Sequence, residues 1–387
     1  MNFSFLSPVS ETVLEIMQDL SMHALGSKVR IHSEKDGLPN LDGVSVAIIG
    51  VLEQRNSKTP DAYLHFNNVR NDFYNLFPGS WNTTIADLGD LKPGETVEDT
   101  YFALKETLSI LINKKIIPIV LGGSQDLTYA NYRAYDALMP MVNVVNVDAC
   151  FDLGDASKSI SDRSFVGKII LDEPYNLFNY AAIGYQTYFN SQEELDLIKK
   201  LYFEAYRLGD VSSNIRLVEP VMRDAHLVSI DLNAVKASEV SVSQQISPNG
   251  FDGKEICAIA RYAGISNKLS SFGIYNYKVS INDSATSMLL AQMIWYFIEG
   301  LNGRVNDDDF SKDEEFQKFI TLVEDQELIF FKSLITNRWW VEIPFLSTVN
   351  TKLKKHTLLP CTLQDYKDAC NNIIPERWFK AFQKNSL

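Results

Sequence analysis

Residues 116–126 read IIPIVLGGSQD, and this run decides the fold class. Its first six residues are almost continuously apolar, which is typical of a strand whose two faces are both buried in a parallel sheet. The glycine pair that follows permits a tight turn or the close approach of a ligand. A phosphate-binding loop would need further glycines and a lysine in register, which this run lacks. The run therefore predicts a buried strand followed by a turn that can face a ligand.

Similar apolar runs recur between about residues 43 and 300 and alternate with longer amphipathic stretches. This alternation predicts an α/β fold in which helical crossovers join parallel strands. Strands are expected at residues 44–51, 83–88, 116–121, 142–148, 179–184, 226–232 and 269–275. Helices are expected at residues 97–113, 127–138, 192–208, 254–266 and 285–299.

The composition of the 387-residue chain is that of a globular protein, with 45% hydrophobic and 22% charged residues. Lys and Arg number 36 against 49 Asp and Glu, so the formal net charge is −13. This surplus argues against binding of nucleic acid or of an anionic membrane, and it suits a small cationic ligand better. No stretch reaches the roughly 20 apolar residues of a membrane span. Four scattered cysteines and the absence of a signal-peptide pattern lead us to expect a cytoplasmic protein.

Polar residues follow three of the expected strands, and ligands of parallel sheets bind beyond the carboxyl ends of the strands. The three ends are GGSQD at residues 122–126, DACFD at 148–152 and SIDLN at 229–233. They would bring Asp148, Asp152 and Asp231 to one rim of the sheet. Carboxylates gathered in this way bind a cation, share a proton or are separated by basic side chains, because like charges raise one another's pKa. The alternative is that these aspartates only cap the turns that follow the strands.

None of the five histidines follows one of these strand ends. A Ser-His-Asp or Cys-His arrangement therefore has no evident general base. Nucleophilic hydrolysis through Cys150 is not expected.

The three strand ends, taken in order, resemble the ureohydrolase family of arginase, agmatinase and formimidoylglutamase, which carries GGDHS, DAHxD and SxDxD at these places. Further similarity lies in DLGD at residues 87–90, IPIV at 117–120, IG at 183–184 and PNGF at 248–251. Formimidoylglutamase-like members are the most similar. The resemblance covers roughly residues 40–303 and implies a three-layer α/β/α sandwich with a mainly parallel sheet. We expect this domain to be formed by residues 1–303. A C-terminal extension, residues 304–387, lies beyond the resemblance.

Active relatives bind two Mn²⁺ ions through two His and four Asp, and a bridging hydroxide attacks a guanidinium or amidine carbon. Asp148, Asp152 and Asp231 match three of these ligands. Gln125 and Cys150 stand where the two His belong, and Asn233 stands where the fourth Asp belongs.

Three further positions depart from the family pattern. Ser124 replaces the Asp before the first His, and Lys236 stands where the last Asp of the SxDxDxxD run belongs. The substrate-facing Glu expected near the last strand is replaced around Asn276.

Three carboxylates without an imidazole do not balance two divalent ions, and a thiolate is a poor ligand for Mn²⁺. A di-manganese pair is not expected. Three states remain. The first is a single divalent cation (Mg²⁺, Ca²⁺ or Mn²⁺). The other two are metal-free and favoured: a shared proton, or a nearby basic side chain, for which Lys236 is a candidate. The leading hypothesis is a non-catalytic binding or assembly protein. The alternative is an amidine or guanidine hydrolase of formimidoylglutamase type that uses one metal or an altered pair.

The extension begins with an acidic stretch at residues 306–315, which we interpret as a solvated boundary. It also holds Trp339, Trp340 and Trp378 beside arginines, a composition favoured at interfaces. Two alternatives stay open: the tryptophans form an interface with a protein partner, or they pack the extension onto the sandwich. The resemblance implies a homo-oligomer.

Overall fold

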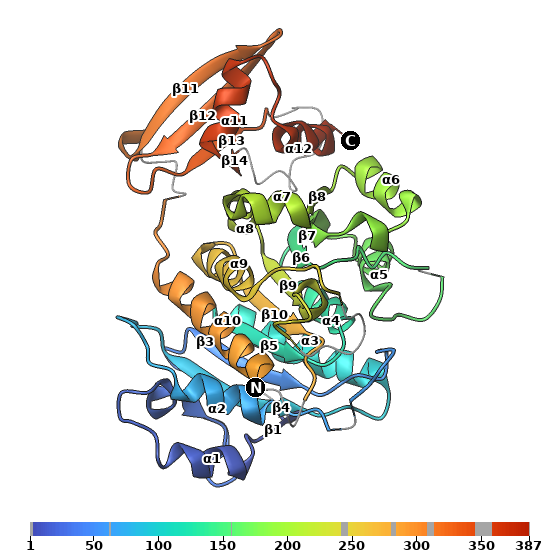
Figure 1. The fold of residues 1–387 in the computed structure, drawn as a ribbon. Helices are drawn as coiled ribbons and strands as arrows, with labels where there is room; N and C mark the ends of the chain where they lie inside the picture. The colour runs from blue at the N-terminus through green and yellow to red at the C-terminus, as the bar shows by residue number, and fades with distance from the viewer. Residues whose placement is uncertain are drawn as a thin grey trace.

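The computed structural model describes residues 3–61, 63–155, 157–240, 247–279, 284–307, 313–344 and 358–386. Most of them belong to an α/β sandwich, and a smaller antiparallel sheet follows at the C-terminal end (Figure 1). None of the helices in the described ranges is long and apolar enough to cross a membrane.

A ten-stranded sheet forms the centre of the sandwich, in the order β1-β4-β3-β5-β10-β9-β6-β7-β8, with β2 beside β4. Its pairs are parallel except for β1 with β4. The strands are β1 (Leu6–Ser7), β2 (Arg30–Ile31), β3 (Val46–Val51), β4 (Ile85–Leu91), β5 (Ile117–Gly122), β6 (Val142–Val147), β7 (Leu177–Tyr185), β8 (Glu204–Arg207), β9 (Leu227–Asp231) and β10 (Ser271–Tyr275). All residues of β3, β5, β6, β9 and β10 are buried, as the apolar runs predict.

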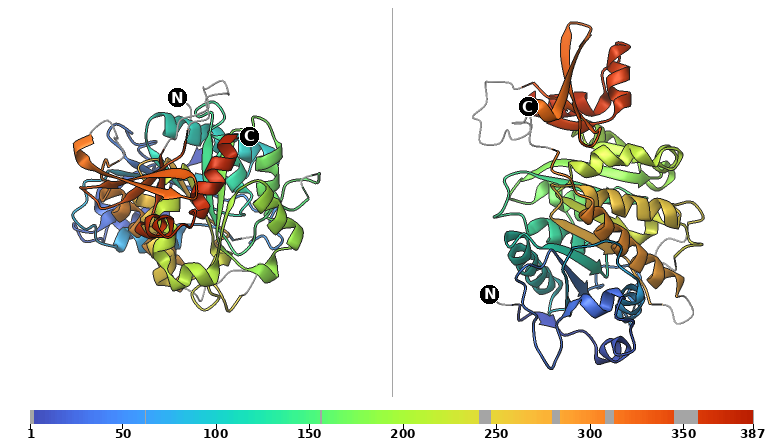
Figure 2. Two further views of the ribbon diagram at one scale, coloured as in Figure 1. Left: turned by 90° about the horizontal axis from the view of Figure 1, so that it is seen from above. Right: turned by 90° about the vertical axis from the view of Figure 1, so that its left-hand side faces the viewer.

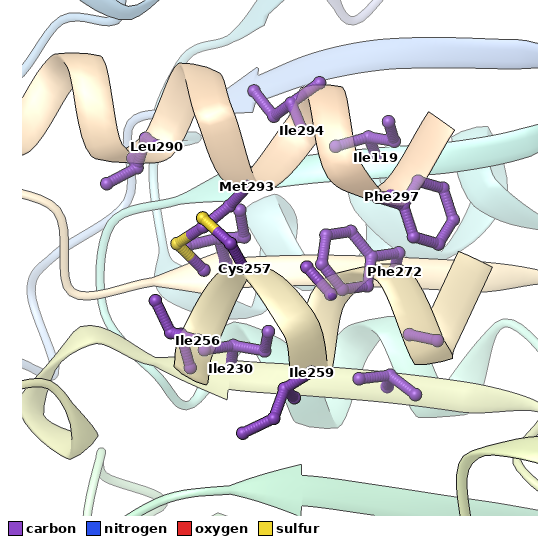
Figure 3. Close-up of a cluster of buried hydrophobic side chains, with 14 of the residues drawn as sticks. Ile119, Ile230, Ile256, Cys257, Ile259, Phe272, Leu290, Met293, Ile294 and Phe297 are labelled. Carbon is purple, nitrogen blue, oxygen red and sulfur yellow. The ribbon is translucent and has the colours of Figure 1, made fainter. Parts of the chain in front are cut away.

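Helices cover both faces of the sheet (Figure 2), so the predicted three-layer α/β/α sandwich is confirmed. One layer holds α1 (Glu11–Met17), α2 (Asn67–Asn75), α7 (Leu208–Ser213), α8 (Glu219–Arg223), α9 (Gly253–Ile265) and α10 (Ala285–Asn302). The other holds α3 (Val97–Asn113), α4 (Leu127–Arg133), α5 (Phe165–Leu171) and α6 (Gln192–Lys200). Figure 3 shows the first layer against the sheet, where the rings of Phe272 and Phe297 stack with their centroids 4.3 Å apart.

All seven expected strands are present, but the helix expected at residues 192–208 is wrong in its second half. α6 begins at a capping box between Ser191 and Glu194 and ends at Lys200. Tyr202 then has a φ of 52°, a left-handed conformation that a helix cannot contain. The chain continues as the edge strand β8, whose half-exposed residues give no continuous apolar run.

The extension contains a second sheet, which the sequence patterns did not predict. Its order is β11 (Phe316–Val323), β12 (Gln326–Ser333), β13 (Trp339–Glu342) and β14 (Leu358–Cys361), with antiparallel pairing throughout. Helices α11 (Leu363–Cys370) and α12 (Glu376–Ser386) accompany it. α10 ends at Asn302, and the division of the chain at residue 303 stays a prediction.

The acidic stretch 306–315 lies partly outside the described residues, which resume at Asp313. Asp307 is buried and forms an ion pair with Arg338 at 3.2 Å. Its carboxylate therefore anchors β13, and the expectation of a solvated boundary is wrong at this position.

The three tryptophans of the extension are buried within this chain. The Arg223 guanidinium of α8 lies 4.6 Å from the centre of the Trp340 ring and donates to the Trp339 carbonyl at 3.1 Å. The indole of Trp378 donates to the Glu342 carbonyl at 2.8 Å. The Trp340 ring therefore packs the extension onto the sandwich, as one alternative predicted, whereas the rings of Trp339 and Trp378 pack within the extension. Binding of another protein to the extension stays a prediction.

Candidate functional site

Four neighbouring strands, β5, β10, β9 and β6, bring the predicted residues to one edge of the sheet. The strands are parallel, so their carboxyl ends point the same way. Gln125 follows β5, Asn276 follows β10, Asp231 ends β9 and Asp148 follows β6. The described residues thus form one buried polar cluster, which we call the strand-end site: Ser124, Gln125, Asp148, Cys150, Asp152, Asp231, Asn233 and Asn276.

Gln125 is held by hydrogen bonds that direct its amide nitrogen into the sheet. Its Nε2 donates to Asn146 Oδ1 at 3.1 Å and to Ser229 Oγ at 2.9 Å. The Oε1 atom is buried and has no hydrogen-bond partner among the described residues. Ser124 Oγ donates to the Glu53 carbonyl at 3.4 Å, which ties it to the end of β3.

The turn after β6 contains two acids and a thiol, all buried. Asp148 Oδ1 accepts the backbone N–H of Cys150 at 3.0 Å. Asp152 has a φ of 52°, so the backbone turns sharply at this acid. Its Oδ1 lies 3.4 Å from Nη1 of Arg163, while its Oδ2 is buried without a hydrogen-bond partner among the described residues.

Asp231 is surrounded by amide donors. Its Oδ1 accepts the Asn233 backbone N–H at 2.7 Å and Asn276 Nδ2 at 2.9 Å, and its Oδ2 accepts Asn233 Nδ2 at 3.1 Å. Asn276 has a φ of 62° and donates its N–H to the Gly123 carbonyl at 2.6 Å. The amides at these two positions therefore stabilise a carboxylate that they face.

The electrostatics of the strand-end site favour bound protons. Burial and the charge of the neighbouring Asp152 raise the pKa of Asp148 well above its usual value. Burial raises the pKa of Asp152 to about 6 even though Arg163 lowers it, and burial together with Asp148 raises the pKa of Asp231 to about 7. Burial and the same acids raise the pKa of the Cys150 thiol, so a thiol rather than a thiolate is expected at neutral pH.

In the described part of the chain, Arg163 is the cation that forms an ion pair with one of these acids, and the candidate Lys236 forms none with them. Arg163 lies in the loop before α5, eleven residues beyond Asp152 and outside every family motif. Lys236 instead lines a hollow together with Gln186, Arg207 and Glu255. A search for arginines near each strand end, not only within the motifs, would have included Arg163.

The possible metal ligands of the strand-end site differ from those of a centre that holds two metal ions. Within the described ranges, no three His, Cys, Asp or Glu side chains are grouped so that they could hold a metal ion. The buried acceptors that lack a partner there are Gln125 Oε1, Asp152 Oδ2 and Asn233 Oδ1. Two neutral amide oxygens and one carboxylate oxygen are a poor ligand set for two divalent ions, although hard cations accept such oxygens singly.

A mainly parallel sheet between two helical layers, with acids gathered at its carboxyl edge, defines an α/β protein of arginase-like fold. The model of the Arginase family matches residues 45–299, about two thirds of the sequence. The chain belongs to the arginase family.

Curated relatives are formimidoylglutamases. That of Streptococcus gordonii is 25% identical over 235 residues, which are 56% of this chain and 71% of the relative. That of Macrococcus caseolyticus is 31% identical over 135 residues, which are 34% of this chain and 42% of the relative.

Solved structures share the fold. Formimidoylglutamase from Bacillus subtilis has a TM-score of 0.63 at 16% identity, over 74% of this chain and 94% of that one. Trypanosoma cruzi formiminoglutamase, solved with Mn²⁺, has a TM-score of 0.61 at 15% identity, over 69% and 96%.

Proposed function

We propose that this arginase-family protein is a non-catalytic binding or assembly protein whose strand-end site works without a pair of metal ions. One observation carries the proposal: the positive charge beside Asp152 comes from Arg163, and the amides of Asn233 and Asn276 donate to Asp231. In active members of the family, the positions of Asn233 and Asn276 carry acids that face a metal ion and the substrate. In this chain, hydrogen-bond donors from the protein compensate the negative charge of the acids in place of metal ions. Without two metal ions, no bridging water is activated.

The groups left for a ligand are acceptors. Gln125 Oε1, Asp152 Oδ2 and Asn233 Oδ1 are buried without partners in the described part of the chain. Unpaired buried acceptors cost free energy, so a bound group that donates hydrogen bonds would recover it. Binding at the rim of the sheet is therefore favoured even without catalysis.

The second candidate is an amidine hydrolase that holds one divalent cation, Mg²⁺, Ca²⁺ or Mn²⁺. The same three acceptors favour it, together with the Asp148 carboxyl, and the curated relatives are named formimidoylglutamase. A cation bound there would polarise a substrate. The chain's own groups would then have to release their protons, because the pKa values of Asp148, Asp152 and Asp231 are all raised.

Metal analysis and a turnover assay test the proposal. The full chain, purified with Mn²⁺ present, is expected to hold less than one Mn²⁺ and to release neither formamide nor urea from amidine and guanidine substrates. Two bound Mn²⁺ per chain, or turnover that Asp148→Ala abolishes, would contradict it.

A variant with restored family ligands supplies the matched control. Gln125→His, Cys150→His and Asn233→Asp together put back two imidazoles and one carboxylate. This triple variant is expected to bind more Mn²⁺ than the wild-type chain. Equal metal content in both proteins would show that the substitutions at these positions do not decide metal binding.

The family resemblance also supports a homo-oligomer, and light scattering of the full chain measures its mass. A cytoplasmic location belongs to the same proposal, because the cysteines are few and no disulfide forms between the described ones. Cell fractionation with an antibody against the chain tests it.

A further inference from the structure

A polar hollow lies beside the strand-end site. It has a volume of 360 Å³ and opens between the ends of β7 and β8 and the loop after β9. The backbone N–H of Gln186, in its wall, donates to the Ala149 carbonyl at 2.9 Å. Ala149 lies between Asp148 and Cys150, so the hollow and the strand-end site share one turn of the chain.

The walls of the hollow are fixed by hydrogen bonds within the protein. Gln186 Nε2 donates to the Asn249 carbonyl at 3.2 Å, and the Tyr188 hydroxyl donates to Gln186 Oε1. Across the hollow, the backbone N–H of Lys236 donates to the Phe251 carbonyl at 3.0 Å. A ligand would therefore meet a largely preformed site, which reduces the entropy cost of binding.

The charge of the lining is positive although the whole chain carries −13. Arg207 and Lys236 line the hollow, and neither forms an ion pair with a described carboxylate. Glu255 is the acid of the lining, and its Oε2 already accepts the Asp252 N–H at 2.9 Å in the capping box of α9.

Two further acids lie near this hollow but are not part of its lining. Asp210 and Glu376 both act on the Tyr185 hydroxyl, as Arg207 does with the opposite sign. Neither acid lines the hollow, and Glu376 is paired with Lys380 at 2.6 Å. Two cationic side chains therefore face a hollow whose one acid is engaged elsewhere.

Hydroxyl groups complete the set of donors, since Tyr185, Thr187 and Ser212 also line the hollow. We propose that the hollow is an anion site, in which Arg207 and Lys236 bind the carboxylate or phosphate group of a small ligand. An arginine fork suits both groups, because each offers two oxygens in a plane. This anion site rests on the proposed binding function, because a ligand bound in the hollow would lie against the turn that carries Asp148.

Two other hollows differ in chemistry. One is lined by Glu239 and Asp252 with Lys254, so acids outnumber bases. The other is apolar apart from Lys384. Of these three hollows in the described chain, the one at Arg207 and Lys236 combines two unpaired cations with several hydroxyl donors.

Calorimetric titration of the full chain with inorganic phosphate and, separately, with glutarate tests the proposal. Saturable binding of either probe is expected, and the probe that binds more tightly tells phosphate from carboxylate as the recognised group. Glutaramide, which has the same shape as glutarate without its charge, is expected to bind at least tenfold more weakly than glutarate.

Variants locate the site. Arg207→Gln and Lys236→Gln are each expected to weaken binding at least tenfold, since each removes a charged donor. The control Lys254→Gln removes the same charge outside the hollow and is expected to change affinity less than twofold. Both test residues reach the surface, and a thermal scan establishes that the variants fold.

Absence of saturable binding by both probes would overturn the anion site, as would equal loss in the control and the test variants. Neither result bears on the proposed function, because metal content and turnover are measured without these anions. Conversely, two bound Mn²⁺ ions would overturn the proposed function, and the titration with phosphate and glutarate would still decide whether the anion site exists.

Discussion

Two buried acids on the same sheet, Asp87 and Asp148, differ in the way their charge is compensated. Asp87, on β4, accepts from Arg70 Nε at 2.9 Å and from Arg70 Nη2 at 3.1 Å. It also accepts the Tyr74 hydroxyl at 2.8 Å and the Gly89 N–H at 2.9 Å. Every lone pair of this carboxylate that faces the protein has a donor, and the pair joins α2 to the sheet.

Asp148 has much weaker partners. It accepts one backbone N–H at 3.0 Å and Asn146 Nδ2 at 3.4 Å, and the nearby Arg163 pairs with Asp152 instead. The same burial therefore produces a rigid framework at Asp87 and an incompletely satisfied cluster at Asp148. Incomplete compensation is a property of ligand sites, because a ligand that supplies the missing donors gains the free energy that the protein alone does not recover.

The largest difference in stability between the two regions is expected when the arginine beside each acid is removed. Arg70→Met leaves the buried Asp87 and the half-buried Asp90 without their cation, which we expect to lower the free energy of unfolding by about 3–5 kcal/mol. Urea denaturation followed by fluorescence measures the change at pH 7.

Arg163→Met is the matched variant at the strand-end site. Asp152, with a pKa of about 6, can take up a proton when its cation is removed, and the Arg163 side chain is 26% exposed. We expect a loss of no more than about 1 kcal/mol. Equal losses in the two variants would show that Arg163 is as much part of the framework as Arg70.

The pH dependence of stability sharpens the same contrast. Asp152 and Asp231 have folded-state pKa values of about 6 and about 7, above the ordinary 3.8. The folded state therefore binds these protons more tightly than the unfolded state, so their contribution is complete below the ordinary pKa and is lost as the pH rises through 6 and 7. Between pH 6 and pH 8 we expect the contribution of these two acids to the free energy of unfolding to fall by about 2 kcal/mol, and the raised pKa of Asp148 adds to the fall in the same direction.

Urea denaturation at intervals of pH measures this slope, and Asp231→Asn is expected to flatten it. Stability that rises from pH 6 to pH 8 would mean that the acids are ionised throughout. Addition of Mn²⁺ at pH 8 is an internal check, because a cation that binds the carboxylates would restore the lost stability.

The sequence predicted the sheet because its central strands are buried on both faces. Residues 117–122 and 142–147 are continuously apolar apart from two asparagines, and such runs have few alternatives to a parallel strand. Their polar ends could then be assigned to one rim from the strand polarity alone. Half-exposed strands have no continuous apolar run, so β8 and the hairpin of β11 and β12 were not predicted.

The strand-end site was predictable in its members but not in its contacts. Motif positions placed Asp148 and Asp231 together, yet the direction in which an amide points depends on its neighbours. Gln125 turns its nitrogen to Asn146 and Ser229 only because those residues offer oxygens beside it. Arg163 comes from a loop outside the motifs, whose path the sequence does not determine, so the candidate cation named from the motifs was Lys236.

The smallest change in stability is expected when Asp148 itself is substituted. The pKa of Asp148 is raised well above its usual value by burial and by Asp152, which favours the neutral carboxylic acid, and Asp148→Asn replaces it by a neutral group of the same shape. We expect the free energy of unfolding to change by less than about 1 kcal/mol. Asp87→Asn in the same assay should cost about 3 kcal/mol, because Arg70 then loses its principal partner in a fully buried position. A large loss in Asp148→Asn would mean that Asp148 is ionised in the folded chain, and the strand-end site would then need a second cation besides Arg163.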